Sequence, residues 1–197
     1  LGKRTGWPQN RPAPHNIPFV MLGAGILWFG WFGFNAGSAL AADGAATQAF
    51  VNTFIAGAAG MVAWMIVEMA KTGKVSTIGM ASGIVAALVA ITPAAGFVGS
   101  MHSFVFGALA GVICFFAIEA KFRFGFDDSL DVVGIHFVGG AVGGILLGFM
   151  ADSSAVPGGD FANGVFFGGG ILLWNQILSI AVVTAFSFGA TYIIAKV

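Results

Sequence analysis

Charged residues are scarce in this sequence of 197 residues. Asp, Glu, Lys and Arg make up only 8% of the chain, and hydrophobic residues make up 58%. Soluble domains carry roughly 25% charged residues, so this composition excludes an ordinary soluble domain. The formal net charge is zero and basic clusters are lacking, which argues against nucleic-acid binding. The composition therefore predicts an integral membrane protein.

Groups that could perform covalent or metal chemistry are also few. The single cysteine, Cys114, lies in an apolar run and can form neither an intrachain disulfide nor a thiolate metal site. The apolar segments contain no Ser/His/Asp arrangement and no cluster of His and carboxylate side chains with ligand spacing. We therefore expect no metal, no cofactor and no enzymatic activity.

Apolar segments of about the ~20 residues that cross a bilayer recur along the chain. They predict an all-α, polytopic membrane protein with six transmembrane helices at residues 17–41, 47–70, 76–93, 101–120, 131–151 and 171–195. The third is the shortest, and Pro93 is expected to end it. Residues 1–16 form a connector before the transmembrane domain at 17–197, and the Gly-rich segment 161–170 is expected to be a re-entrant or surface segment.

The distribution of basic residues predicts the orientation. If six spans are threaded alternately, one side receives every basic residue, namely Lys3, Arg4, Arg11, Lys71, Lys74, Lys121, Arg123 and Lys196. The loops of the other side, 41–46, 94–100 and 152–160, contain only the acidic residues Asp43, Asp152 and Asp160. By the positive-inside rule, the connector and both ends of the chain are cytoplasmic in a cell (plasma or inner) membrane.

The first span contains an unusual mixture of aromatic and polar side chains. Leu27, Trp31, Phe34 and Ser38 recur at helical spacing, so one stripe carries an aliphatic group, an indole, a phenyl ring and a hydroxyl. Such a stripe could line a narrow, mostly dry pore. An interfacial aromatic belt combined with small-residue packing would explain the same residues.

A histidine lies inside the fifth span. His136 is surrounded by apolar and small residues, and the glycines that follow it form overlapping GxxxG patterns that let helices approach closely. An ionisable residue within a membrane span is a candidate functional group. A packing role is the alternative, because a lone histidine in an apolar helix is commonly a satisfied core residue.

Several strings together resemble one family. PHNIPFV, GWFGFNAGSAL, AFVNT, ITPAAGFVG and DDSLDVVGIHFVGGAVGGILLG are similar to the second half of the ammonium transporter family (Amt/Mep/Rh). The resemblance implies eleven transmembrane helices, of which the first ten form two inverted repeats. This chain would supply helices six to eleven, that is, the second inverted repeat and the final long helix. Its start without Met, in a Pro-rich connector, also leads us to expect a partial chain.

The resemblance implies roles for individual residues. Ser38 would provide the hydroxyl of an outer ammonium-recognition site, Phe34 one of two stacked gate rings, and His136 the second of two pore histidines. Trp31 and Leu27 would form the pore wall. Further pore-lining positions are Asn35, Thr92, Val132 and Asp131.

The implied function is transport of ammonium or ammonia across the lipid bilayer. A membrane ammonium sensor of the same family is the alternative. The resemblance also implies a homotrimer, with a PII-type regulatory protein as a possible cytoplasmic partner.

Overall fold

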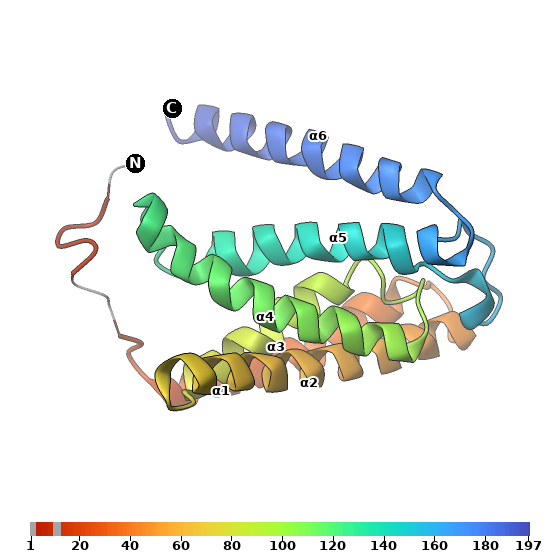
Figure 1. The fold of residues 1–197 in the computed structure, drawn as a ribbon, viewed down its shortest axis with the longest axis horizontal. Coiled ribbons are helices and arrows are strands. Elements are labelled where there is room, and N and C mark those ends of the chain that lie inside the picture. Colours follow the sequence, from red (N-terminus) through yellow and green to blue (C-terminus); the bar gives the residue numbers. More distant parts are fainter. Residues whose placement is uncertain (1–2, 10–12) are drawn as a thin grey trace.

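The computed structural model describes residues 3–9 and 13–197, so Leu1 and Arg11 of the connector lie outside the described residues. Helices and turns make up this part of the chain, without any strand (Figure 1). The α-helices are α1 Ile17–Gly37, α2 Gly44–Thr72, α3 Thr77–Ile91, α4 Ser100–Phe124, α5 Val138–Met150 and α6 Ile171–Ile194. A π-helix, Val133–Phe137, precedes α5, and 3-10 turns cover Ser153–Ala155 and Val165–Phe167.

The predicted all-α membrane fold is confirmed, with one span shorter than the others. Five helical segments are long and apolar enough to cross a membrane, the π-helix and α5 counting as one segment, Val133–Met150. The third, α3, has 15 residues and ends at Ile91, directly before Thr92 and Pro93. Thr92 still has helical dihedral angles, but Pro93 lacks the amide donor that would continue the helical hydrogen bonds, which explains this early end.

Local capping sets the helix ends. The side chains of Asn16, Asp43 and Ser76 accept hydrogen bonds from backbone amides in the first turns of α1, α2 and α3. At the other ends, Gly73 and Gly125 adopt left-handed conformations that close α2 and α4. These caps satisfy amides and carbonyls that have no partner within the helix.

The centre of the bundle consists of α2, α3 and α4. At Gly60 and Gly107 an added methyl group would meet backbone atoms of neighbouring helices, so glycine is needed for their close approach. Helix α1 packs against α2 and α3, whereas α5 packs against α3 and α4. Helix α6 runs along α5 at the edge of the bundle and contains no buried residue (Figure 1). Broad apolar faces of α1 and α6 are therefore open to lipid or to other protein.

The described ends of the chain lie at the same end of the bundle. Residues 3–9 and the C-terminus are found there, and the connections that follow α1, α3 and α5 lie at the opposite end (Figure 1). We refer to these as the inner and outer ends, after the predicted orientation. Six helices that alternate in direction place both ends of the chain at the same end of the bundle, as the prediction of six alternating spans requires.

Two local features differ from the prediction. Helix α1 ends at Gly37, four residues before the predicted end at residue 41, and Leu40 then adopts a positive φ of 56°. The span predicted at 131–151 begins with a π-helix, a form that hydrophobic periodicity does not reveal. The Gly-rich segment 161–170 contains only a short 3-10 turn, in agreement with its predicted lack of regular helix.

Candidate functional site

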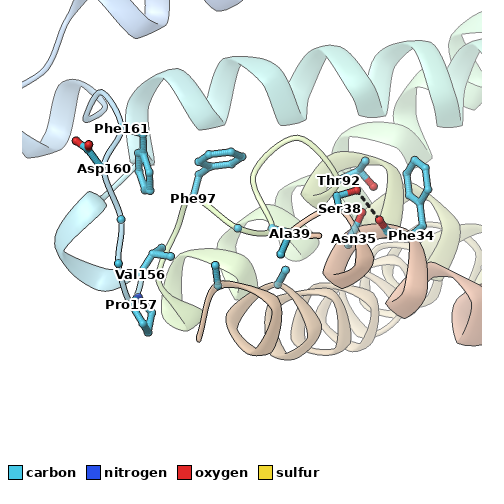
Figure 2. A pocket seen from close by; sticks show the side chains of 16 residues that line it. Phe34, Asn35, Ser38, Ala39, Thr92, Phe97, Val156, Pro157, Asp160 and Phe161 are labelled. Carbon is cyan, nitrogen blue, oxygen red and sulfur yellow. Dashed lines mark hydrogen bonds between the residues drawn. The ribbon is translucent and has the colours of Figure 1, made fainter. Parts of the chain in front are cut away.

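A cavity of about 310 Å³ lies at the outer end of the bundle. Its walls are the end of α1, the start of α2, the connection after α3 and the loop 156–161 (Figure 2). Four residues predicted from the sequence line it, namely Phe34, Asn35, Ser38 and Thr92. We call it the outer cavity. The fold therefore brings these four predicted residues, from two different helix ends, to one place.

The hydroxyl of Ser38 is held at the end of α1. Ser38 is the C-cap residue, and its Oγ donates a hydrogen bond to the carbonyl oxygen of Phe34 over 2.7 Å. A hydroxyl has one proton and two acceptor lone pairs. Because its proton is used within the helix, the Ser38 oxygen faces the cavity as an acceptor, which suits an N–H donor.

Trp31 connects α1 to the end of α3. Its Nε1 donates to the Oγ1 of Thr92 over 2.7 Å, and Thr92 Oγ1 in turn donates to the carbonyl oxygen of Leu88. The Trp31 ring also meets the Phe34 ring edge to face at 6.1 Å between centroids. Both predicted aromatic side chains are thus oriented by contacts, although the Phe34 side chain remains 62% exposed.

Asn35 makes a structural contact beside the cavity. Its Nδ2 donates to Thr53 Oγ1 over 2.9 Å, and Thr53 donates to the carbonyl oxygen of Ala49. Asn35 and Thr53 are both buried. This pair joins α1 to α2 and thereby helps to fix the end of α1, where Phe34 and Ser38 line the same cavity.

The far wall of the outer cavity was not found by sequence reasoning. Phe97 and Phe161 meet edge to face with 5.0 Å between ring centroids, and Asp160 lies at the rim (Figure 2). Asp160 is the only ionisable side chain among the lining residues. The acidic loops of the outer side were visible in the sequence, but nothing there placed the loop 156–161 opposite α1.

His136 lies in the π-helix and is exposed. The start of this helix is held by Asp128, whose Oδ2 accepts from the backbone amide of Val133 over 2.7 Å. Gly134 allows the helix to approach Ile118 of α4. His136 does not line the outer cavity, and neither do Trp31, Leu27 and Val132. The structure thus leaves the predicted pore histidine on an uncovered surface.

A second cavity, of about 970 Å³, lies at the inner end. Asp131 and Ile135 line it together with residues of the connector, the starts of α1 and α3 and the end of α4. Asp131 forms an ion pair with Lys121, whose Nζ also donates to the carbonyl oxygen of Asp128. Among the predicted pore residues, only Asp131 lies at this inner cavity.

The connector is fastened to the inner end of the bundle. Arg4 forms a bidentate pair with Asp127, at 2.6 Å between Nη2 and Oδ1, and the ring of Trp7 stacks on Phe122. The hydrogen bonds from the guanidinium hold the pKa of Asp127 below its ordinary value, and the same contact raises the pKa of Arg4. The carboxylate and guanidinium thus stabilise each other's charged forms.

These features define a polytopic membrane protein with a small, partly aromatic cavity at one end of its helix bundle. In the part of the chain that the structure describes, no three His, Cys, Asp or Glu side chains are grouped to hold a metal ion. The model of the Ammonium Transporter Family matches residues 1–197. The chain therefore belongs to the ammonium transporter family, which confirms the family predicted from the sequence motifs.

Known members of this family are similar to this chain in sequence and in structure. An ammonium transporter of Mycobacterium tuberculosis is 50% identical over 201 residues, which cover 100% of this chain and 42% of that protein. The crystal structure of Candida albicans Mep2 superposes with a TM-score of 0.89 at 37% identity, over 95% of this chain and 42% of that one. A structure described as a sensor Amt protein gives 0.82 at 28% identity, over 95% and 45%. The chain thus spans less than half the length of these relatives, whose descriptions are of transporters and a sensor and not of enzymes.

Proposed function

We propose that this chain forms the outer recognition site and one wall of a pathway that carries ammonium nitrogen across a cell membrane. The observation that carries the proposal is the outer cavity, which Ser38 with its acceptor oxygen, Phe34 and Thr92 line together. Aromatic faces attract cations by roughly 0.5–2 kcal/mol. A hydroxyl acceptor adds a directional preference for an N–H donor, which potassium cannot offer.

The substrate can pass the apolar interior only as a less charged species. A bare cation at mid-membrane costs several kcal/mol, whereas neutral ammonia crosses a dry constriction at little cost. We therefore propose that ammonium is recognised at the outer cavity and transfers one proton to water at the outer mouth before neutral ammonia moves past Phe34. His136 then offers a hydrogen-bonding partner within an apolar wall, as a neutral imidazole.

The remaining wall comes from outside this chain. Phe34 is 62% exposed, and Leu27 and Val132 are 47% and 49% exposed, although all three are apolar. We propose that residues 17–197 form part of a larger transmembrane domain, and that another part of the full-length protein covers these residues to close the pore. The proposed assembly is a homotrimer with cytoplasmic chain ends, and a PII-type protein is the proposed regulatory partner at the inner end.

The proposal is tested by uptake of radiolabelled methylammonium into vesicles that contain a protein of the relatives' full length carrying these residues. Ser38→Ala should weaken recognition by about one hydrogen bond, 0.5–1.5 kcal/mol. This corresponds to a rise in KM of roughly two- to twelvefold. Ser179→Ala, at an exposed position of α6, is the matched control and should keep the original KM. Equal KM values in both variants would remove Ser38 from the site.

A sensor is the second candidate, because a structural neighbour with a TM-score of 0.82 is described as a sensor Amt protein. A sensor needs the outer cavity to bind ammonium but needs no flux. Isothermal calorimetry beside the uptake assay separates the two candidates. Binding that is weakened in Ser38→Ala, without uptake by the unsubstituted protein, would favour the sensor.

A further inference from the structure

The connection after α3 is a non-helical segment buried in the bundle. Between the end of α3 at Ile91 and the start of α4 at Ser100, the chain forms turns. Ala94 and Val98 in this segment are 0% exposed, and Ala95 is 2% exposed. Backbone carbonyls in such a segment lack helical partners and need donors from elsewhere, above all within a membrane.

Asn52 of α2 supplies these donors. Its side chain is 0% exposed, and its Nδ2 donates to the carbonyl oxygens of Ala95 and Val98 over 2.8 and 2.7 Å. Its Oδ1 accepts from Gln48 Nε2 over 3.1 Å, and the same Nε2 lies 3.1 Å from Ser100 Oγ. Both amide protons and the acceptor of Asn52 are therefore used, which leaves this side chain a single well-defined position.

The segment held by Asn52 forms a large part of the outer cavity. Thr92, Gly96 and Phe97 line the cavity, and Thr92 also receives the indole proton of Trp31. The carbonyl oxygen of Phe97 accepts from the backbone amide of Asp152 over 2.9 Å, which ties the start of the opposite loop to the same segment. The position of residues 92–99 thus sets the separation between the α1 wall and the Phe97–Phe161 wall.

We propose that Asn52 is a positioning residue that sets the width of the outer cavity and hence its preference for ammonium over methylated ammonium ions. Asn52 lies behind the wall and acts through residues 92–99. A wall displaced by about 1 Å changes selectivity strongly in sites of this size, because a small cation is distinguished by how closely the walls meet it. This inference rests on the proposed function of the outer cavity.

Asn52→Asp is the sharpest test, because aspartate keeps the shape and the acceptor for Gln48 but loses both donors to the carbonyls. We expect the ratio of KM values for methylammonium and ammonium to fall by about tenfold. Cys114→Ala is the control for general loss of core packing, since Cys114 is 0% exposed and lies outside the cavity lining. This control should lower thermal stability and leave the ratio unchanged. An unchanged ratio in folded Asn52→Asp would overturn the proposal.

A second measurement reports the position of the wall without any transport. In a Cys114→Ala background, Val98→Cys, at a position of the same segment that is 0% exposed, is labelled with a membrane-impermeant thiol reagent. The labelling rate is compared among three proteins: one with no further substitution, one with the milder Gln48→Ala and one with the stronger Asn52→Asp. We expect labelling to accelerate by about tenfold with Asn52→Asp and by less with Gln48→Ala. Equal labelling rates would overturn the positioning role. Absence of uptake by the unsubstituted protein would instead overturn the proposed function, so the two failures are distinguishable.

Discussion

At the scale of single residues, Phe34 and Ser38 at the end of α1 contribute different properties to the outer cavity. Ser38 contributes an acceptor because its proton is bound to the Phe34 carbonyl oxygen. Phe34 contributes a ring that packs only against Trp31 among the described ring contacts and otherwise remains exposed. Removing either side chain therefore costs little packing energy within this chain, so substitutions there report on recognition and selectivity more than on folding.

Phe34→Ala should make the pathway less selective. Replacement of the ring by a methyl group leaves a void at the cavity wall, through which water and hydrated cations enter. We expect increased potassium leak and a smaller preference for methylammonium, measured in vesicles containing the full-length protein.

Phe29→Ala is the matched control, because Phe29 is a 79% exposed phenylalanine of the same helix and lies outside the outer cavity. Potassium leak that rises equally in both variants would show that loss of any ring on α1 perturbs the bundle. Unchanged selectivity in Phe34→Ala would exclude its gating role.

The sequence predicted only some of the residues that line the outer cavity. Phe34 and Ser38 lie on a stripe at helical spacing, whereas Thr92 and the roles of all three residues came from the resemblance to the family. Phe97 and Phe161 could not be predicted, because their contact joins loops 64 residues apart through tertiary packing. Asn52 was likewise not predicted. Its proposed role depends on the carbonyl groups of Ala95 and Val98, which have no helical partners after α3 ends.

At the scale of elements, the six apolar segments and the early end of α3 followed from hydropathy and from Pro93. The π-helix did not, because an inserted residue shifts the hydrogen-bond pattern without changing composition. The side chain of Asp128 stabilises this π-helix by accepting a hydrogen bond from the backbone amide of Val133, five residues later in the chain. The prediction of a regular helix from residue 131 therefore failed in the segment Val133–Phe137, which contains His136.

Asp128→Ala should loosen the π-helix. Loss of the acceptor leaves the Val133 amide without its partner, which costs about 1 kcal/mol. Hydrogen–deuterium exchange of residues 133–137, followed by mass spectrometry, should accelerate, whereas exchange in α4 should not change. Glu119→Ala is the control, since Glu119 is a half-exposed carboxylate 4.0 Å from Lys71. Protection that stays the same in Asp128→Ala would show that packing of Gly134 on α4 alone holds the π-helix.

The inner-end ion pairs join residues that are separated along the chain. Lys121 pairs with Asp131, ten residues away. Glu119 approaches Lys71 of α2. The chain reversal after Gly125 brings Asp131 back to Lys121, and a reversal of this kind cannot be read from helical spacing.

At the scale of the whole molecule, the contact between Arg4 and Asp127 couples the connector to the bundle in a pH-dependent way. In the folded protein the pKa of Asp127 lies below its ordinary value of 3.8. The stabilisation that the Arg4–Asp127 pair gives to the docked connector is therefore fully present above pH 3.8. It is lost as the pH falls through the depressed pKa, because the protonated carboxyl no longer pairs with Arg4. We therefore expect the connector to detach only under acidic conditions, below about pH 3.8.

Detachment is measured by acrylamide quenching of Trp7 fluorescence, taken as the difference between the protein and its Trp7→Phe variant. Trp7 stacks on Phe122 at 5.3 Å between ring centroids, which shields it while the connector is docked. Asp127→Asn should show at neutral pH the quenching that the unsubstituted protein shows only in acid. Equal shielding of Trp7 in both proteins at pH 7 would mean that stacking holds the connector without the ion pair.

The largest-scale prediction concerns the open wall of the pore. Leu27, Phe34 and Val132 expose large apolar surfaces, and His136 is exposed, which the proposed function interprets as one wall of a pore without its opposite side. Vesicles that contain only these residues should show no ammonium-specific flux, whereas a protein of the relatives' full length should conduct. Stopped-flow measurement of internal pH after an ammonium pulse reports the flux, and circular dichroism verifies that the shorter chain is helical. Selective flux through the shorter, folded chain would show that these helices enclose a complete pathway, and would contradict the proposal that another part of the protein closes it.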